Sequence, residues 1–257
     1  MNMLVNLDQL PGIVILEEKG RITKYEYQGD IYYYKRSRSV DNYYYEVLAN
    51  IIGRELGIHT VSYQFATYQD GIGTVSKDYR MHGYQNIDDL IQNVYEGDVN
   101  QYNNLEDLKM AFERLFSKES ADRLFSSLID AFLFDVLIGN SDRHTENYGI
   151  YTTPEIRFAP LFDHENMLDE RAIYGGEYCL GVKRGDYYRR DENLFYKMLE
   201  KDEKYKNKIL TMLPAISEEK LQMYFSEIAE ETFVNETIKQ KILKRFSDNE
   251  IMIRRGL

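Results

Sequence analysis

The stretch Gly139-Asn140-Ser141-Asp142-Arg143-His144-Thr145-Glu146-Asn147 and the later pair Phe162-Asp163 decide how the rest of the chain is interpreted. Asn147 follows Asp142 by five residues, and Asp163 follows it by 21. Phosphoryl transfer from Mg-ATP uses such a trio, in which one carboxylate orients and deprotonates the acceptor hydroxyl while an amide and a second carboxylate hold Mg²⁺. We therefore expect Asp142 to be catalytic and Asn147 and Asp163 to bind the metal. A polar loop between a buried helix and a strand is the alternative.

The residues before this stretch indicate a long, mostly buried helix. Ser117 or Ser120 could cap its start, and Gly139 would end it. Its apolar residues recur at helical spacing: Ala121, Leu124, Phe125, Leu128, Ile129, Phe132, Leu133 and Val136.

The residues after the stretch indicate a hairpin. Residues 148–151 and 156–161 are typical of strands, and residues 152–155 form a turn between them. Because Asn147 and Asp163 bracket this hairpin, its folding would bring their side chains together. A helix, a loop, a hairpin and an Asp in this order favour the catalytic interpretation.

A nucleotide-binding lysine is expected upstream. Residues 31–35 form a β-type run that ends in Lys35, and a helix capped by Asp41 or Asn42 follows and closes at Gly57. A lysine at the end of a strand is otherwise most often solvated. With the downstream motif present, we expect Lys35 to hold the nucleotide phosphates.

On this helix, Glu46 lies eleven residues after Lys35, within reach of a Lys–Glu pair that would hold the lysine against the phosphates. Glu55 shares the helix and is the alternative partner.

A second phosphate-binding element is expected in the loop of residues 17–24, between strands at 13–16 and 25–27. A glycine-rich loop of the eukaryotic kinase type is absent. Lys24 and the backbone amides near Gly20 could still attract phosphates. A plain basic hairpin turn explains the same residues equally well.

The chain segment that would meet adenine is expected at residues 75–79. A strand-like stretch at 61–68 precedes it, with a turn at residues 71–73. Since adenine would be bound by backbone atoms, this expectation rests on the order of the segments alone.

Residues 138–144 and the sequence Phe158-Ala159-Pro160-Leu161-Phe162-Asp163 resemble the HipA-type serine/threonine kinases, a bacterial family in which some members are toxins of toxin–antitoxin pairs. The resemblance loosely covers residues 12–190. The Asp-Arg-His-x-x-Asn stretch is also similar to that of the phosphatidylinositol kinases. HipA-type kinases carry Gly-x-Gln-x-Lys in the phosphate loop; Gly20 and Lys24 fit this pattern, whereas Ile22 replaces the Gln.

The resemblance implies an α+β, bilobal kinase fold with a strand-rich N-lobe at residues 1–82 and a helical C-lobe at residues 83–257. It implies ATP and Mg²⁺ as cofactors and a protein substrate with a Ser or Thr acceptor. Autophosphorylation, at Thr23, Ser37 or Ser39, and an antitoxin or regulatory partner are further expectations. Full-length HipA proteins have an additional N-terminal region, and this sequence begins almost at the phosphate loop. The alternatives are a phosphatidylinositol (lipid) kinase and an inactive kinase-fold binding module.

The composition agrees with a cytoplasmic protein. The net charge of −11 argues against direct nucleic-acid binding. Residues 183–190 form one basic segment, which is a solvated loop, a patch that attracts nucleic acid, or part of an activation segment. No apolar run is long enough to span a membrane, and the first residues lack the positively charged and long apolar regions of a signal peptide. The single cysteine, Cys179, excludes an intrachain disulfide. The tyrosine clusters at 32–34 and 43–45 are expected to pack in the core.

The C-terminal third is expected to be helical and supportive. Helices are predicted at residues 193–199, 205–213, after Ser217, and at 237–246, each with one apolar face. An earlier helix at 105–116 would be capped by Asn104, after a flexible stretch at 95–103.

Overall fold

The computed structural model describes residues 4–80, 82–94, 105–175, 181–184, 187–190, 194–228 and 235–257. The predicted flexible stretch at 95–103, its cap Asn104 and the single Cys179 lie outside the described residues. The same holds for the side chains of the basic segment 183–190. Within the described ranges, no helix combines the length and the apolar character that a membrane span requires.

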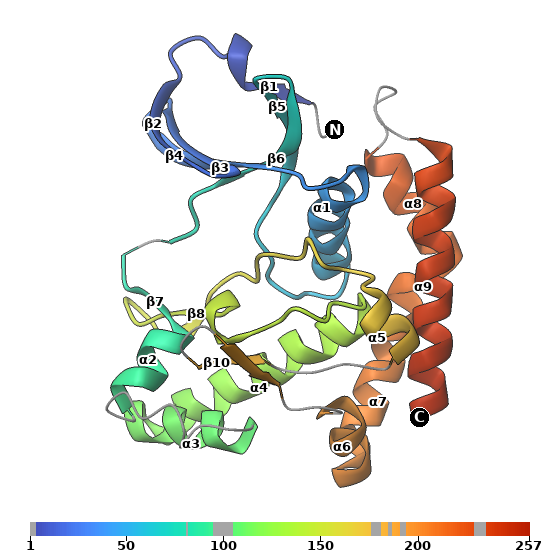
Figure 1. Cartoon of the computed structure of the whole chain (residues 1–257). Coiled ribbons are helices and arrows are strands. Elements are labelled where there is room, and N and C mark those ends of the chain that lie inside the picture. Colours follow the sequence, from blue (N-terminus) through green and yellow to red (C-terminus); the bar gives the residue numbers. More distant parts are fainter. Residues whose placement is uncertain are drawn as a thin grey trace.

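A six-stranded sheet forms the N-terminal part, with the strand order β1-β5-β6-β4-β3-β2. Its strands are β1 (Val5–Asn6), β2 (Val14–Lys19), β3 (Ile22–Tyr27), β4 (Asp30–Arg36), β5 (Gln64–Tyr68) and β6 (Gly71–Lys77). The β1–β5 pair is parallel and the other pairs are antiparallel. The sheet curls strongly, as Figure 1 shows at the top of the molecule. A small core fills the curl, made of Leu7 from the 3₁₀ helix η1 (Leu7–Gln9), Tyr25, Tyr34, Ala66 and Val75.

Two turns in this sheet differ from the sequence-based expectation. The expected eight-residue loop at 17–24 is wrong, because β2 and β3 pair as far as Lys19 and Ile22 and leave a tight turn at Gly20 and Arg21. The turn between β5 and β6 lies at residues 69–70 rather than 71–73. Gln69 and Asp70 adopt the positive φ angles that a tight hairpin turn needs, of 48° and 60°.

Helix α1 (Val40–Glu55) follows β4 and packs against β5 and β6. Its N-cap is Ser39, not Asp41 or Asn42, because the chain leaves the extended conformation directly after Ser39. The helix closes before Gly57, as predicted, where φ is +68°. The buried side chains of α1 belong to the same hydrophobic core as those of the C-terminal helices. Consequently the sheet is anchored to the rest of the chain through this helix.

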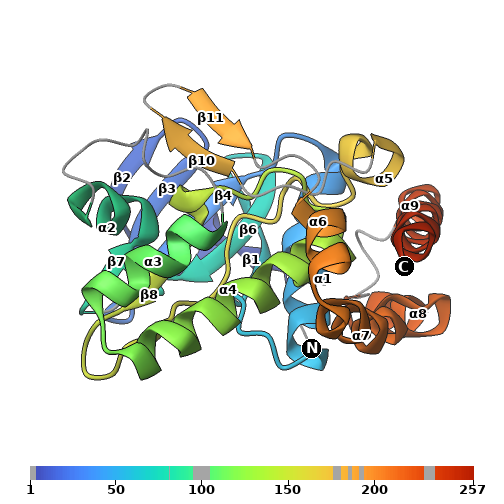
Figure 2. The ribbon, with the colours of Figure 1, turned by 90° about the horizontal axis from the view of Figure 1, so that it is seen from below.

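The C-terminal part is helical, with α4 (Lys118–Leu137) at its centre (Figures 1 and 2). Ser117 rather than Ser120 caps α4, since its hydroxyl accepts the Ser120 backbone N–H at 3.3 Å. Around α4 lie α2 (Ile87–Val94), α3 (Leu105–Leu115), α5 (Glu170–Gly175), α6 (Leu194–Lys201), α7 (Glu203–Met212), η4 (Leu213–Ile216), α8 (Glu218–Ile228) and α9 (Glu236–Gly256). Helices α3, α7 and α9 contact α4 directly. The predicted C-terminal helices are confirmed, and α9 is ten residues longer at its end than expected.

The end of α4 leads into the segment that carries the sequence motif. Gly139, with φ at +63°, ends the helix as predicted, and a Cβ here would lie 3.3 Å from the Leu168 Cα. The 3₁₀ helix η3 (Thr145–Asn147) and the predicted hairpin of β8 (Gly149–Tyr151) and β9 (Arg157–Phe158) follow. Strand β7 (Tyr84–Asn86) completes this small sheet. A separate pair, β10 (Gly181–Arg184) and β11 (Tyr187–Arg190), comes later.

The chain therefore has the predicted α+β architecture, with a strand-rich part followed by a helical part. The expected boundary between residues 82 and 83 falls in the connection from β6 to β7 and stays a prediction.

Candidate active site

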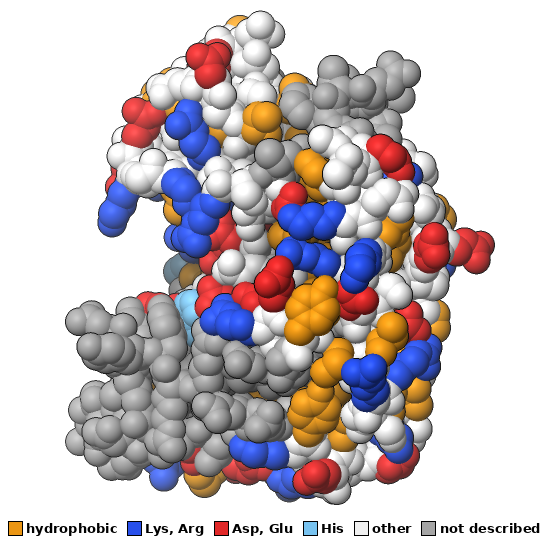
Figure 3. All heavy atoms as spheres, turned by 45° about the vertical axis from the view of Figure 1, so that its right-hand side comes forward, with side chains coloured by type: hydrophobic (Ala, Val, Ile, Leu, Met, Phe, Trp, Pro, Cys, Tyr) orange, Lys and Arg blue, Asp and Glu red, His pale blue; other side chains and the backbone are white. Residues whose placement is uncertain are grey.

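A cleft of about 350 Å³ lies where the six-stranded sheet faces the segment after β9. Figure 3 shows the molecule hollowed below the strand-rich part, with Lys and Arg side chains gathered beside Asp and Glu. The residues that line the cleft are Arg21, Ile22, Tyr33, Lys35, Arg38, Tyr63, Ser76, Tyr79, Arg80, Phe162, Asp163 and Glu165. Four of these are cationic and two are anionic, so the cleft favours an anionic ligand.

Lys35, near the end of β4, connects three carboxylates at the back of this cleft. Its Nζ lies 2.6 Å from Oδ1 of Asp163, 3.2 Å from Oε1 of Glu46 and 3.3 Å from Oε2 of Glu165. Burial alone would lower the pKa of Lys35, but the charges of Glu46, Asp163 and Glu165 outweigh it and raise the pKa above its ordinary value. Lys35 is therefore a charged lysine whose three partners come from two separate segments, α1 and the segment after β9.

Glu46 is the partner that α1 supplies, as the sequence predicted. It is 2% exposed, and its Oε2 accepts the backbone N–H of His164 at 2.9 Å. Burial tends to raise the pKa of Glu46, but the charge of Lys35 and the hydrogen bond from His164 hold it well below its usual range. The alternative, Glu55, bonds Lys220 on α8 instead. Of the two candidates, only Glu46 reaches Lys35.

Asp142 is half-buried in the loop after α4, and hydrogen bonds fix both its carboxylate and its backbone. Oδ2 of Asp142 accepts a 2.8 Å hydrogen bond from Nδ2 of Asn166. The Asp142 backbone N–H donates to Oδ1 of Asn140 at 3.2 Å, and Nδ2 of Asn147 donates to the Asp142 carbonyl at 3.4 Å. Side chains on both sides of Asp142 therefore set its position.

A buried ion pair shapes this loop from inside. Arg143 and Asp135 of α4 are each 1% exposed and form two hydrogen bonds, of 2.8 and 2.9 Å. Asn140 donates to Oδ1 of Asp135 at 2.8 Å. Burial by itself would lower the pKa of Arg143, yet the charge of Asp135 raises it further above its usual value. The loop is thus locked to the last turns of α4 by charge-assisted hydrogen bonds.

The same guanidinium brings the two expected metal ligands together. Nη1 of Arg143 donates to the backbone carbonyl of Asn147 at 3.3 Å and to that of Phe162 at 2.6 Å. Since Asp163 follows Phe162, both ends of the hairpin meet at Arg143. Asp163 itself adopts a positive φ of 61°, a conformation that Asp tolerates better than most residues.

The chemistry of these two side chains fits Mg²⁺. Nδ2 of Asn147 is engaged by the Asp142 carbonyl and by Nε2 of His144 at 3.2 Å, so its amide oxygen is the atom left for a cation. The Asp163 carboxylate is about one third exposed toward the cleft. A few protein oxygens, with waters and phosphate oxygens for the rest, are the usual environment of Mg²⁺. No cluster of three or more His, Cys, Asp or Glu suited to a metal occurs in the described part of the chain.

The two histidines of this region differ in role. His144 contacts the Asn147 amide and so helps to fix the loop, and burial lowers the pKa of His144. His164 is fully buried, with Nδ1 3.6 Å from Oε2 of Glu46. Within the described residues, neither ring nitrogen of His164 has a hydrogen-bond partner. His164 therefore packs beside the Lys35–Glu46 pair.

The two residues expected in the phosphate loop lie at the edge of this arrangement. Gly20 forms the β2–β3 turn, and the ammonium of Lys24 lies 5.9 Å from the centre of the Tyr33 ring. The residues of this hairpin that line the cleft are instead Arg21 and Ile22. Thr23, the only hydroxyl expected in the loop, is buried in β3.

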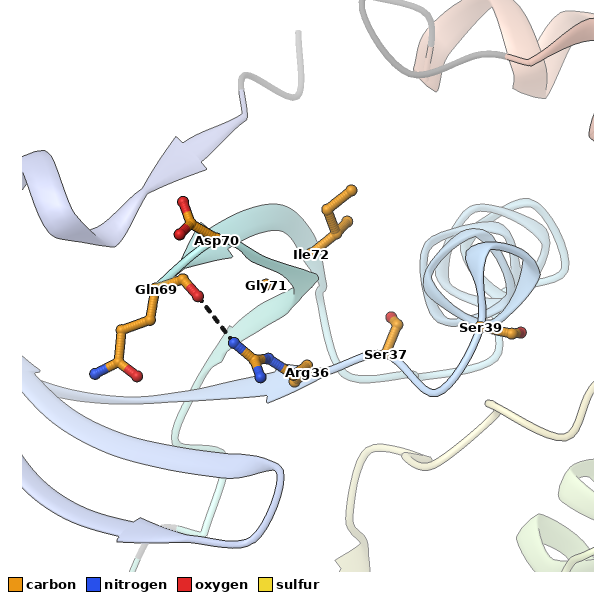
Figure 4. A pocket seen from close by; sticks show the side chains of 7 residues that line it. All are labelled: Arg36, Ser37, Ser39, Gln69, Asp70, Gly71 and Ile72. Carbon is orange, nitrogen blue, oxygen red and sulfur yellow. Dashed lines mark hydrogen bonds between the residues drawn. The ribbon is translucent and has the colours of Figure 1, made fainter.

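A larger cavity of about 560 Å³ lies outside the candidate site. Figure 4 shows it between the end of β4, the β5–β6 turn and the start of α1. The Arg36 guanidinium crosses it and donates to the Gln69 carbonyl at 3.0 Å. Its lining residues are Arg36, Ser37, Ser39, Gln69, Asp70, Gly71 and Ile72. None of the residues expected to bind ATP or Mg²⁺ is among them.

Four contributors to the site were missed from the sequence: Arg21, Asp135, Glu165 and Asn166. Asp135 left one signal, since it is an acidic residue within an apolar helical run and precedes the arginine of the motif by eight positions. Glu165 and Asn166 follow Asp163 closely, but their partners are 144 and 24 residues away. No local pattern could have revealed those contacts.

The sequence profile described as the HipA-like C-terminal domain matches residues 18–235. The chain belongs to this family. The proinflammatory kinase CtkA of Helicobacter pylori has a similar structure, with a TM-score of 0.69 and 19% identity over 99% of this chain and 98% of that one.

The structure of HipA from the Shewanella oneidensis toxin–antitoxin system, solved with HipB and operator DNA, is also similar. Its TM-score is 0.56 at 16% identity, and the match covers 94% of this chain and 65% of HipA. At these identities, the two structures support the predicted bilobal, kinase-like fold of this chain. No curated protein sequence matches the chain.

Proposed function

We propose that this protein is a kinase that transfers the γ-phosphoryl group of Mg-bound ATP to a Ser or Thr hydroxyl of a protein. The observation that carries the proposal is the position of Lys35, which contacts Glu46 of α1 and Asp163 after β9 at once. These partners lie 11 and 128 residues away in the sequence. Phosphoryl transfer requires this lysine, its glutamate and a metal-binding aspartate to be in place together.

Each side chain then has a defined task. Lys35 holds the nucleotide phosphates, and Glu46 keeps its ammonium in position. Asn147 and Asp163 provide the oxygen atoms that would hold Mg²⁺, which neutralises the charge that develops on the phosphoryl group. Asp142, oriented by Asn166, accepts the proton of the attacking hydroxyl. Catalysis by this arrangement consists mainly of positioning and electrostatic stabilisation.

Gly20 and Lys24 have weaker parts in this proposal. Gly20 directly precedes Arg21, which lines the cleft, and Lys24 adds positive charge to the same hairpin. We assign them an auxiliary role in attracting phosphates, in support of Lys35.

Transfer of labelled phosphate from ATP tests the proposal. The wild-type chain, incubated with Mg-ATP and mixed protein acceptors, should label itself or an acceptor, and Asp142→Ala and Asp163→Ala should each abolish labelling. Asp122→Ala, at an exposed position on α4, is the matched control and should leave labelling unchanged. Labelling that survives both active-site changes would contradict the proposal.

The acceptor is tested in the same assay. Phosphoinositide vesicles in place of protein distinguish a lipid kinase, because a lipid kinase would label the vesicles and no protein. Mapping of phosphosites by mass spectrometry would show whether the chain modifies itself. Ser39 is exposed and Thr23 is buried, so Ser39 is the more accessible of these two expected positions.

A toxin role with an antitoxin partner is a further hypothesis, based on the family. Expression of the wild-type chain in bacteria should arrest growth, whereas Asp142→Ala should not. Growth that is equal for both would argue against the toxin role and would leave the kinase proposal to the labelling assay.

A further inference from the structure

Glu165 sits in the candidate nucleotide cleft as a buried carboxylate with three cationic neighbours. Its side chain is 7% exposed. Both terminal nitrogens of Arg21 bond its two oxygens at 3.0 Å, and Nζ of Lys35 lies 3.3 Å from Oε2. Nη2 of Arg38 lies 3.5 Å from Oε1. A bound phosphate group would attract the same set of cationic side chains.

The Arg21–Glu165 contact has the geometry of phosphate recognition. A guanidinium presents two parallel N–H groups, which match the oxygens of a carboxylate or of a phosphate equally well. The cleft that contains this contact is also lined by Lys35 and Asp163, to which the proposed function assigns the phosphates and the metal. A nucleotide whose phosphates reach Lys35 therefore arrives within the same group of cations.

Hydrogen bonds of the Arg21 backbone and side chain fix this residue at the edge of the cleft. It occupies the β2–β3 turn, where its carbonyl accepts the Arg36 N–H at 2.8 Å. Its Nη1 also donates to the Arg36 carbonyl at 3.0 Å. These contacts fix the guanidinium over the end of β4 and next to Lys35. Its side chain is 30% exposed, so a ligand in the cleft can reach it.

Glu165 is anchored through its backbone rather than through its carboxylate alone. Nδ2 of Asn42 donates to the Glu165 carbonyl at 2.5 Å, and the preceding residue, His164, is bound to Glu46. The main chain can therefore stay in place while the side chain exchanges partners.

We propose that Arg21 is a further ligand of the nucleotide phosphates, and that these phosphates displace the Glu165 carboxylate from Arg21 when the nucleotide binds. This inference rests on the proposed function, since it takes the cleft to be the ATP site. In the structure, Glu165 pairs with Arg21, Lys35 and Arg38. When ATP binds, its phosphates replace Glu165 at Arg21, so the two anions compete for one guanidinium.

Equilibrium binding of a fluorescent Mg-ATP analogue to the full chain tests this exchange, with adenosine as a competitor that lacks phosphates. Arg21→Ala should weaken ATP binding by about tenfold or more, as expected for the loss of charge-assisted hydrogen bonds. Adenosine binding should stay unchanged. Glu165→Gln removes the competing charge and should tighten ATP binding by about threefold or more. In the Arg21→Ala background, the gain from Glu165→Gln should be clearly smaller.

Three variants complete the design. Lys19→Ala and Glu26→Gln change exposed charges on the same hairpin and should leave ATP binding unchanged. Lys35→Ala should weaken ATP binding and reports on the proposed function by itself. Thermal unfolding of every variant separates a loss of binding from a loss of folding.

The outcomes distinguish the two proposals. If Lys35→Ala weakens ATP binding while Arg21→Ala and Glu165→Gln change nothing, Arg21 is no phosphate ligand and the proposed function stands. If Arg21→Ala and Glu165→Gln both weaken ATP and adenosine binding alike and both lower the unfolding temperature, the pair is a structural clamp, and the exchange is disproved. If the wild type binds neither ATP nor adenosine, both proposals fail.

Discussion

Asp135 of α4 and Arg143 of the following loop form a doubly hydrogen-bonded ion pair from which solvent is almost entirely excluded. The guanidinium has a further task, because it also binds the backbone carbonyls of Asn147 and Phe162. A single buried side chain therefore links the helix before the motif to both ends of the hairpin after it. The positions of Asn147 and Asp163 depend on this link.

Arg143→Ala should lower the free energy of unfolding by about 3–5 kcal/mol, because it leaves Asp135 charged and unpaired in the core. Denaturant unfolding measures this loss. Arg123→Ala breaks the exposed pair with Glu119 on the same helix and should cost no more than about 0.5 kcal/mol. Equal losses of unfolding free energy in the two variants would show that the buried pair stabilises the fold no more than the exposed pair does.

Asn166→Ala should lower kcat about tenfold while the KM for ATP stays nearly unchanged. Under the proposed function, the reason is that Asn166 orients the Asp142 carboxylate through a 2.8 Å hydrogen bond and does not line the cleft that contains Lys35. The loss should be smaller than that of Asp142→Ala, since a general base contributes about 10²–10⁴-fold. Steady-state kinetics measure both. Asn207→Ala, exposed on α7, is the control, and a rise in KM without a change in kcat would contradict the positioning role.

The Lys35–Glu46 pair should make stability depend on acid pH. The pKa of Glu46 is lower in the folded protein than its ordinary value of 4.5. A carboxyl with a lowered folded pKa stabilises the fold fully above its unfolded pKa, and the contribution disappears as pH falls through the folded value. The stability difference between wild type and Glu46→Gln should therefore be greatest at about pH 6 and should shrink steadily below about pH 4.5.

Urea unfolding at a series of pH values measures this dependence. Glu113→Gln, which removes an exposed carboxylate from α3, should follow the wild-type curve. A difference between wild type and Glu46→Gln that is constant with pH would mean that the Glu46 charge does not stabilise the fold.

Gly73→Ala should destabilise the sheet at the strand that carries Lys35. A Cβ at Gly73 would lie 2.1 Å from the Lys35 carbonyl oxygen and 2.9 Å from the Tyr34 ring, so β4 and β6 would have to separate. We expect a loss of about 1–3 kcal/mol, typical of overpacking, and weaker ATP binding. Ile72→Ala, which also changes β6 but at a side chain that is 37% exposed, should lower the free energy of unfolding by less. A fully stable Gly73→Ala with normal ATP binding would contradict this interpretation.

Much of the candidate site was predictable, because its residues lie in short patterns. The trio of Asp142, Asn147 and Asp163 and the helix before it come from spacing and periodicity within about 45 residues. The pair of Lys35 with Glu46 followed from a strand and a helix that are neighbours in the chain. In each case, local geometry determines which side chains share a face.

The errors lie where local patterns are ambiguous. The expected loop at 17–24 is a strand pair, because partners on β4 and β2 satisfy backbone groups that the sequence alone leaves open. The cap of α1 at Ser39 instead of Asp41 or Asn42 is a shift within the usual uncertainty of helix ends.

The sequence by itself determined the order of strands and helices and the family to which the chain is similar, and it predicted the chemistry of the motif. Only the tertiary structure decided that Glu165 lies between Arg21 and Lys35, that Asn166 orients Asp142, and that Arg143 closes the hairpin on α4. The physical reason is the range of the interactions. Periodicity reports which face of an element is apolar, whereas ion pairs between segments 144 residues apart depend on how whole elements pack.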